Sequence, residues 1–426
     1  MRYLPRIVDK ELDLRLESFG ATLIVGPKGC GKTTTARQRA ASMVEFEDED
    51  RRTGYLAVAS IQPSLLLEGP KPRLFDEWQD APSIWGAIRK SVDDLQQNGL
   101  YILTGSTSQK ARLSHTGTLR ISTMQMGPMS LFESGESNGS VSLAELFQDP
   151  ASFDGCHSEL TIPELIFAIC RGGWPLAVNN RTERSQLAVA RDLFRQTCSV
   201  DVRNVDSSCT NTDWATAILQ SYARNICTTA STKTIRADAQ VATGMSESSF
   251  YHYKSALEEL YMVENLTAWC PSIRSKTAIR SSSKRNLVDP SIAVAATGLS
   301  PAYFREDFKT LGFLFESLCI RDLKSYSVAL DGSMSYYRDR YGLEADGVLH
   351  LSDGRYALVE FKLGSHEIDD AAKHLNEIER LVKKHNESEQ QVPLRLPNLK
   401  MVVTGTEYGY RRDDGVLVVP IGALRD

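Results

Sequence analysis

The 426-residue sequence has no long hydrophobic run, and no stretch approaches the roughly 18 uninterrupted apolar residues that a membrane-spanning helix needs. Its first residues, Met1 to Arg6, lack the apolar segment of a secretory signal. The eight cysteines are scattered and form no C-x-x-C pair, which argues against a disulfide or zinc framework. We therefore expect a soluble, cytoplasmic protein with reduced thiols and no membrane partner.

The sequence also lacks an excess of positive charge. Its 49 Lys and Arg residues stand against 54 Asp and Glu residues, which gives a net charge of −5. Nothing global therefore indicates nucleic acid or an anionic membrane, and any basic surface must be local. The hydrophobic fraction of 42% and the charged fraction of 24% are those of a globular protein and argue against extended disorder. The length favours about two to four domains.

One glycine-rich loop stands out near the start of the chain. Residues 21–25 predict a buried strand, residues 34–41 predict a helix, and a G-x-x-x-x-G-K-[ST] motif lies between them. Such a loop can point successive backbone N–H groups into one concavity, where nucleotide phosphates replace water as acceptors. We predict that the nucleotide is bound by Gly26, Pro27, Lys28, Gly29, Cys30, Gly31, Lys32, Thr33 and Thr34.

Two side chains of this loop have defined roles in such a site. Lys32 would reach the β and γ phosphate oxygens as a point charge, and the Thr33 hydroxyl would bind Mg²⁺. The sequence therefore predicts ATP and Mg²⁺ as cofactors. The alternative is a glycine-rich turn at the edge of a sheet.

A pair of acids follows a later apolar strand. Residues 73–79 predict a strand that ends in Asp76 and Glu77. At the carboxyl end of a parallel strand beside the glycine-rich loop, Asp76 would hold Mg²⁺ through water, and Glu77 would orient the attacking water. This is the setting of a Walker B element, and an acid pair at the surface is the alternative.

Further strands would complete this sheet, and we predict them at residues 55–59, 100–107 and 118–122. The second of these ends in small hydroxyl residues, so that Ser106 or Thr104 would hydrogen-bond the γ-phosphate or the water at a sensor-1 position. An ordinary strand-ending turn is the alternative. Arg112 and Arg120 are the nearest candidates for a transition-state arginine, from the same subunit or from a neighbour.

The order of these elements, with one extra strand between the two Walker motifs, resembles AAA+ and related ATPases. Four stretches look like a large prokaryotic family of AAA+-type ATP-binding proteins with a C-terminal domain of unknown function, namely residues 74–79, 103–106, 128–133 and 171–175. The resemblance extends over nearly the whole chain. It implies a helical lid from about 136 to 200 and places Gly173 and Pro175 near the nucleotide base.

Residues 201–272 resemble a winged helix-turn-helix, with helices expected over 214–226, 235–243 and 246–260. If this unit reads DNA, the groove would be faced by Ser248, Ser249, His252 and Lys254. The alternative is a winged helix used only for protein packing, because its last helix has a single lysine and ends in two glutamates. The basic run 274–285 would track a phosphate backbone or form a solvated loop.

A second group of charged residues lies near the C-terminus. Residues 341–351 and 355–363 predict two strands joined by a three-residue turn with Gly354 in the left-handed conformation. That turn pairs Asp346 with Glu360 and leaves one face of the hairpin wholly apolar. A two-residue turn would mix the faces, so burial selects the longer loop.

Asp346, Glu360 and Lys362 would thus converge on one patch, and their spacing is similar to that of the PD-(D/E)XK nuclease fold. The resemblance implies that the two carboxylates bind Mg²⁺ while Lys362 helps to activate water. Glu316 on an upstream helix would be a further metal ligand. The alternative is a charged sheet face with Glu344 paired to Lys362, and nuclease folds can persist without cleavage.

We therefore expect an α/β protein with three parts. They are a P-loop AAA+-type ATPase core with its helical lid over residues 1–200, a winged helix-turn-helix over 201–272, and a restriction-endonuclease-like α/β domain over 273–426. The expected function is an ATP-binding protein and Mg²⁺-dependent ATPase coupled to a domain that contacts or cuts nucleic acid, with DNA as the expected polymer. The rival is a nucleotide-gated regulator or scaffold with an inert nuclease-like fold. A homo-oligomer is left open.

Overall fold

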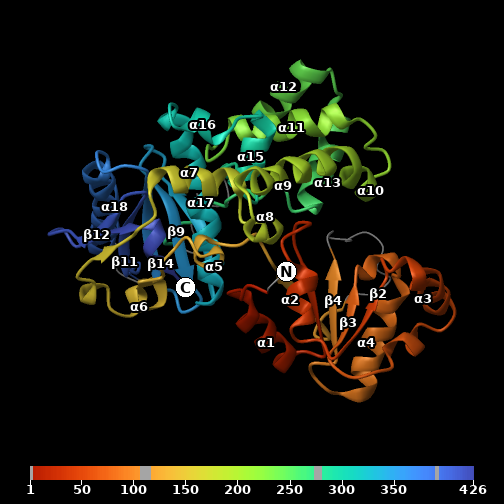
Figure 1. The fold of residues 1–426 in the computed structure, drawn as a ribbon. Helices are drawn as coiled ribbons and strands as arrows, with labels where there is room; N and C mark the ends of the chain where they lie inside the picture. The colour runs from red at the N-terminus through yellow and green to blue at the C-terminus, as the bar shows by residue number, and fades with distance from the viewer. Residues whose placement is uncertain (1–2, 106–116, 273–280, 389–392) are drawn as a thin grey trace.

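The computed structural model describes residues 3–105, 117–272, 281–388 and 393–426. Figure 1 shows three lobes: a parallel sheet with its helices, a helical lobe, and a C-terminal lobe built on a second sheet. The N-terminal segment lies near the place where the lobes meet (Figure 1). None of the helices in these described ranges combines the length and the apolarity needed to cross a bilayer.

The first sheet has five parallel strands in the order β2-β3-β4-β1-β5. These are β1 (Ala21–Val25), β2 (Ser42–Glu45), β3 (Arg73–Asp76), β4 (Tyr101–Gly105) and β5 (Ile121–Gln125). The accompanying helices are α1 (Val8–Ser18), α2 (Lys32–Arg37), α3 (Glu49–Ile61) and α4 (Ser83–Leu95). Every residue of β1 and β4 is buried, as expected of parallel strands covered on both faces. The glycine-rich loop follows β1 at the carboxyl edge of this sheet.

Two strand predictions in this lobe are wrong in position. Residues 55–59 belong to α3, and the strand between the two Walker motifs is β2. The helix forms because Asp48 caps its first turn by accepting from Asp50 N, and because acids in that turn favour the N-terminal end of a helix. The last strand covers 121–125 rather than 118–122.

The helical lobe contains the helices expected at 235–243 and 246–260. Its helices are α7 (Ile162–Arg171), α8 (Pro175–Asn179), α9 (Glu183–Gln196), α10 (Val202–Val205), α11 (Thr212–Arg224), α12 (Thr232–Thr243), α13 (Glu247–Glu259) and α15 (Pro290–Thr297). The Ser246 hydroxyl accepts from Ser249 N and caps α13. Antiparallel bridges join Val263 to Leu287 and Leu266 to Lys284.

The C-terminal lobe is built on a sheet of order β7-β12-β13-β11-β10-β9-β8. Its elements are α16 (Pro301–Phe304), α17 (Phe308–Val328), β8 (Gly332–Arg338), β9 (Glu344–Leu351), β10 (Tyr356–Lys362), α18 (Ile368–Ser388), β11 (Leu399–Thr404), β12 (Tyr408–Arg411) and β13 (Leu417–Pro420). Apolar residues of one sheet face pack in a core with α17, and others pack against α18. The sheet therefore lies between these two helices.

The register predicted for β9 and β10 is confirmed. Ala357 pairs with Leu349, Leu351 N donates to Arg355 O, and Gly354 has a φ of +86°. These are the pairs that the three-residue turn gives. The register places Asp346 near the start of β9 and Glu360 near the end of β10, on neighbouring strands.

Residues 141–157, which the sequence assigns to the lid, pair with the C-terminal lobe instead. β6 (Val141–Ser142) pairs with β14 (Leu424–Arg425), and β7 (Cys156–His157) pairs with β12. α6 (Leu143–Gln148) lies between these strands in sequence and beside the C-terminal sheet in Figure 1. Residues 141–157 thus belong to the C-terminal lobe, although they precede the helical lobe in sequence.

Candidate functional site

The loop after β1 curls at three glycines. Gly26, Gly29 and Gly31 have φ values of +149°, +80° and +104°, which glycine adopts without strain. A Cβ at Gly26 would lie 2.0 Å from the Met126 carbonyl oxygen, so a side chain cannot be accommodated there. The loop ends where α2 begins at Lys32, and the N-terminus of a helix favours anions.

Side chains of the two Walker motifs meet at the carboxyl edge of the sheet. Thr33 Oγ1 donates to Asp76 Oδ1 over 2.7 Å, and Thr104 Oγ1 donates to the same oxygen over 2.5 Å. Lys32 Nζ donates to two carbonyl groups of the loop, at 2.9 and 3.0 Å. Hydroxyl and carboxylate oxygens are ligands that a hard cation prefers, so Thr33 and Asp76 fit Mg²⁺.

Glu77 directly follows this carboxylate. It has a left-handed backbone, with φ +50° and ψ +51°, and its carboxylate accepts a hydrogen bond from Gln79. A non-glycine residue in this conformation is uncommon and is enriched at functional sites. Ser106 and Arg112 lie outside the described residues. Arg120 precedes β5 at the amino edge of the sheet and pairs with Asp93, so within its own chain it lies at the wrong end for a transition-state arginine.

Two residues from other segments lie against the loop. Arg6 Nη1 donates to the Cys30 carbonyl oxygen over 2.8 Å, and Arg6 Nε donates to Glu133 Oε1 over 3.0 Å. On another side, a Cβ at Gly31 would lie 3.4 Å from Pro175 Cγ, which is an ordinary packing distance. Pro175, at the start of α8, therefore borders the loop.

The helical lobe also reaches the loop through a carboxylate. Lys28 Nζ lies 3.3 Å from Asp201 Oδ1, at the end of a π-helix spanning Thr197–Asp201. The Asp201 side chain is only 8% exposed, whereas that of Lys28 is 53% exposed. Among the other predicted loop residues, the Cys30 side chain is fully buried and that of Thr34 is exposed.

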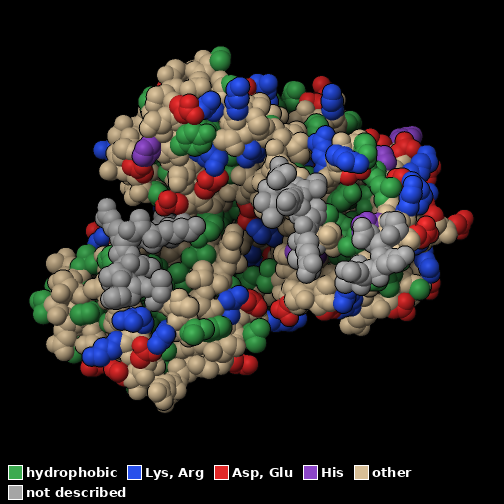
Figure 2. Space-filling view, turned by 180° about the vertical axis from the view of Figure 1, so that it is seen from behind, with side chains coloured by type: hydrophobic (Ala, Val, Ile, Leu, Met, Phe, Trp, Pro, Cys, Tyr) green, Lys and Arg blue, Asp and Glu red, His purple; other side chains and the backbone are tan. Residues whose placement is uncertain are grey.

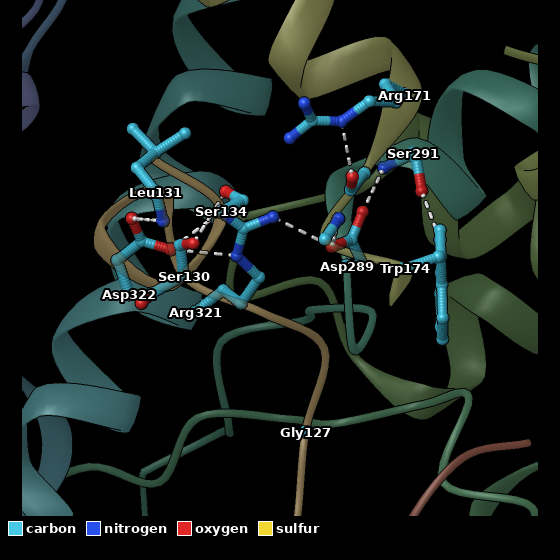
Figure 3. A network of polar contacts seen from close by, with 12 residues as sticks. Gly127, Ser130, Leu131, Ser134, Arg171, Trp174, Asp289, Ser291, Arg321 and Asp322 are labelled. Atoms are coloured by element: carbon cyan, nitrogen blue, oxygen red, sulfur yellow. Dashed lines mark hydrogen bonds and ion pairs between the residues drawn. The ribbon is translucent and has the colours of Figure 1, made fainter. Parts of the chain in front are cut away.

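A buried ionic network joins the C-terminal lobe, the helical lobe and the segment that follows β5 (Figure 3). Arg321 of α17 donates from Nη1 to Asp289 Oδ2 over 2.9 Å and from Nε to Asp322 Oδ1 over 2.8 Å. Asp322 also accepts from Leu131 N, and Asp289 accepts from Gly173 N, each over 3.0 Å. The carboxylates of Asp289 and Asp322 are fully buried. One arginine thus connects the segment after β5, the segment before α8 and the C-terminal lobe.

The predicted C-terminal residues do converge, together with a lysine that the sequence did not indicate. Here the acidic cluster denotes the carboxylates of Glu316, Glu344, Asp346 and Glu360. Lys284 Nζ lies 2.7 Å from Glu316 Oε1, 2.9 Å from Glu344 Oε1 and 3.3 Å from Asp346 Oδ1. Lys362 Nζ lies 2.9 Å from Glu360 Oε2 and 3.6 Å from Asp346 Oδ2. No group of three or more His, Cys, Asp and Glu side chains in the described part of the chain is arranged to hold a metal ion.

Burial and the lysines set the ionisation of this cluster. Burial, followed by the charge of Asp346, raises the pKa of Glu316 and that of Glu360 to about 8. Burial also opposes ionisation of Asp346, but Lys284 and Lys362 outweigh it and hold the pKa of Asp346 below its ordinary value. Burial likewise opposes the charge on Lys284, yet the surrounding carboxylates raise the pKa of Lys284 well above its ordinary value. Lys284 is therefore charged at neutral pH.

The residues predicted to face a DNA groove offer little free positive charge. Lys254 Nζ lies 2.5 Å from Glu258 Oε1, and the Lys254 side chain is mostly buried. His252 Nδ1 lies 3.2 Å from an Asp206 carboxylate oxygen. Ser248 is exposed on α13. Both predicted basic side chains thus already face carboxylates within the helical lobe.

Three segments of the chain match known families. Residues 18–134 match an AAA domain. Together with the loop geometry, this match supports a P-loop core of the AAA type that binds ATP. Residues 162–303 and 311–424 match two domains of unknown function, DUF8612 and DUF4143. No curated protein matches the chain.

Two solved structures resemble the chain at low identity. A Walker-type ATPase of Pyrococcus abyssi is 14% identical, with a TM-score of 0.41, over 68% of this chain and 94% of its own. A STAND-type signal-transduction ATPase with a tetratricopeptide-repeat sensor, from Pyrococcus horikoshii, is 12% identical, with a TM-score of 0.24. That match covers 77% of this chain and 49% of the other. The AAA assignment depends on the family match and the site geometry, not on these two structures.

Sequence reasoning missed three residues that shape these sites. Arg6 and Asp201 contact the AAA-domain loop from distant segments and belong to no motif. Lys284 was included in a basic run predicted to track phosphates or to be solvated, and that prediction is wrong for Lys284 and Arg285, which are 1% and 6% exposed. The available signal was the apolar pair Leu287-Val288 soon after Lys284, which indicates that this end of the run enters the core.

Proposed function

We propose that this protein binds ATP with Mg²⁺ at the loop of the AAA domain and hydrolyses it. The observation that carries the proposal is the 2.7 Å contact between Thr33 Oγ1 and Asp76 Oδ1, because it joins the two Walker motifs at one point. Phosphate oxygens would replace the loop carbonyl groups as acceptors for Lys32 Nζ, and Glu77 would orient the attacking water. Bound Mg²⁺ neutralises charge on the phosphates, with Thr33 and Asp76 as the residues that would hold it.

The test compares Lys32→Ala with Lys90→Ala, which removes an exposed lysine of α4 in the same domain. We expect Lys32→Ala to lower the rate of phosphate release by at least about a hundredfold, because it removes a preorganised positive charge from the transferred phosphate. Lys90→Ala should match the wild type. Phosphate release and calorimetric titration with ATP and Mg²⁺ measure turnover and affinity. A Lys32→Ala variant that hydrolyses ATP at the wild-type rate would refute the proposal.

We further propose that the nucleotide state is transmitted to the C-terminal lobe through the ionic network around Arg321. Pro175 borders the loop, and Gly173, two residues earlier, donates to Asp289, which is paired with Arg321. A buried charge separated from its partner is strongly destabilised, so these groups are expected to move together. A lid that shifts on hydrolysis would therefore carry α17 with it.

For the C-terminal domain we propose two candidate roles. Contact with DNA and its cleavage are supported by the convergence of Asp346, Glu360 and Lys362. A nucleotide-gated regulator or scaffold with an inert nuclease-like fold is supported by Lys284, whose ammonium group stands among the carboxylates that would hold a metal. The geometry favours the second role. In Figure 2 the visible face carries Lys and Arg side chains interspersed with Asp and Glu, rather than one basic field.

A nuclease assay separates the two roles. Supercoiled plasmid is incubated with wild-type protein or with Asp346→Ala, in Mg²⁺ and in Mn²⁺. If the domain is inert, both proteins leave the DNA intact. If it is a nuclease, the wild type nicks the plasmid and Asp346→Ala does not.

The three-helix unit α11–α13, which we propose to be a winged helix, needs a separate test. A salt titration of DNA binding shows how many phosphates it contacts.

A further inference from the structure

Lys284 stands inside the acidic cluster rather than beside it. Its side chain is 2% exposed, and its Nζ contacts carboxylate oxygens from α17 and β9, at 2.7 Å to Glu316, 2.9 Å to Glu344 and 3.3 Å to Asp346. The ammonium group has three donors, and three carboxylates surround it. A divalent cation among these same oxygens would be in direct contact with a positive charge, so the arrangement fits an ammonium group and does not fit Mg²⁺.

The main chain holds Lys284 in this place. Lys284 N donates to Leu266 O, and Leu266 N donates to Lys284 O, both over 2.9 Å. The next residue is held as well, because Arg285 N donates to Thr228 O and Cys227 N donates to Arg285 O, both over 2.7 Å. These four hydrogen bonds fix the main chain of the segment from which the Lys284 side chain reaches into the cluster.

Lys284 and the carboxylates come from different parts of the chain. Lys284 lies within residues 162–303, the segment matched to one domain family, and the acidic cluster lies within residues 311–424, matched to another. The cluster is also balanced by other cations, since Lys362 contacts Glu360 and Asp346, and Arg338 Nη1 lies 3.8 Å from Glu344 Oε2. The middle region thus supplies a cation to the centre of the C-terminal domain.

We propose that Lys284 is a tethered cation that occupies the place of a divalent metal ion in the acidic cluster, so that the wild-type cluster binds no such metal. Removing the Lys284 ammonium group turns the same carboxylates into a cation site of the kind that Mn²⁺ and Mg²⁺ occupy. This inference does not depend on ATP hydrolysis by the AAA domain. It concerns oxygen ligands and a charge that belong to the chain itself.

The test titrates nucleotide-free, full-length protein with Mn²⁺ and follows binding by electron paramagnetic resonance. The variants are Asp346→Asn, Lys284→Ala and Lys284→Ala with Asp346→Asn. We expect Lys284→Ala to gain one Mn²⁺ site, at least about tenfold tighter than any wild-type binding, because a positive charge at the centre has been removed. Adding Asp346→Asn should abolish that site. Mn²⁺ should also raise the melting temperature of Lys284→Ala.

The matched control is Lys400→Ala. Lys400 is a largely buried lysine of β11 in the same lobe, and it pairs over 2.5 Å with Glu379, which is not one of the carboxylates of the acidic cluster. It should gain no Mn²⁺ site. A folded Lys284→Ala variant without a new site would overturn the proposal. If that variant does not fold, the wild-type protein provides the test. Mn²⁺ binding by the wild type that is lost in Asp346→Asn would overturn the proposal, and the absence of such binding would support it.

Discussion

Arg6 donates a 2.8 Å hydrogen bond to the carbonyl oxygen of Cys30, so the segment before the first helix holds the main chain of the phosphate-binding loop. The same guanidinium group donates to Gly127 O and to Glu133, on the segment that leaves β5. The side chains of Arg6 and Glu133 are 4% and 2% exposed. The loop is therefore backed by a desolvated ion pair and not only by its neighbouring strand and helix.

Arg6→Ala should weaken both folding and nucleotide binding. Removing one partner of a buried ion pair costs about 3 to 5 kcal/mol, because Glu133 would remain charged without its partner. We expect a clear fall in melting temperature and a several-fold weaker affinity for ATP, measured by scanning fluorimetry and calorimetry. Arg39→Ala is the control, since Arg39 makes a comparable but partly exposed pair with Asp13. Equal behaviour of the two variants would show that Arg6 does not support the loop.

The pair formed by Lys28 and Asp201 predicts an unusual gain of affinity. If Lys28 contacts nucleotide phosphates as proposed, the Asp201 carboxylate would compete with them for Lys28 and would place negative charge beside them. Asp201→Asn should therefore tighten ATP binding, by a few-fold, while Lys28→Ala should weaken it. In the Lys28→Ala background the effect of Asp201→Asn should shrink, which a double-mutant cycle on ATP dissociation constants measures. Asp206→Asn, in the same lobe, serves as the control. If it tightens ATP binding as much as Asp201→Asn does, the effect comes from the net charge of the protein and not from the contact with Lys28.

Local sequence patterns predicted the parts of this molecule that depend on local physics. The glycine spacing and the strand before it located the loop, because positive φ values at Gly29 and Gly31 are a property of a few residues. The register of β9 and β10 also followed from the alternation of apolar residues and from Gly354 at the turn. Both features are settled within about ten to twenty residues of chain.

Long-range contacts could not be predicted in the same way. Residues 55–59 form an apolar run that suits a strand or a helix, and the cap at Asp48 decides for the helix. The two-residue strands β6 and β7 have no periodicity of their own and exist only because β14 and β12 lie beside them. Lys284 is separated by 32 residues from Glu316 and by 62 from Asp346, so no local pattern reveals that it enters the acidic cluster.

The network around Arg321 predicts that one side chain holds together the C-terminal lobe, the helical lobe and the segment after β5. Arg321→Leu would leave Asp289 and Asp322 buried without their shared cation, at a cost of about 3 to 5 kcal/mol. We expect a lower melting temperature and faster cleavage between the lobes in limited proteolysis, since Leu131 and Gly173 also depend on these carboxylates. Arg412→Leu is the control, because Arg412 pairs with exposed Asp369 at the surface of the C-terminal lobe. If Arg321→Leu and Arg412→Leu have the same melting temperature, the network does not stabilise the fold.

Asp322 gives the protein a pH dependence of opposite sign to that of most carboxylates. Burial outweighs the attraction of Arg321 and raises the pKa of Asp322 from 3.8 to about 6. Between these values the folded chain keeps this proton and the unfolded chain does not, so the contribution of Asp322 to stability falls as pH rises through about 6. Asp322→Asn removes this loss and keeps an acceptor for Leu131 N. The unfolding free energy of the variant, relative to that of the wild type, should therefore increase by about 1 kcal/mol from pH 5 to pH 7.5, as measured from melting curves. Asp13→Asn is the control, because the hydrogen bond from Arg39 lowers the pKa of the Asp13 carboxyl, and its stability relative to the wild type should not change over this pH range. If the stability of Asp322→Asn relative to the wild type is also independent of pH, Asp322 is ionised throughout this range.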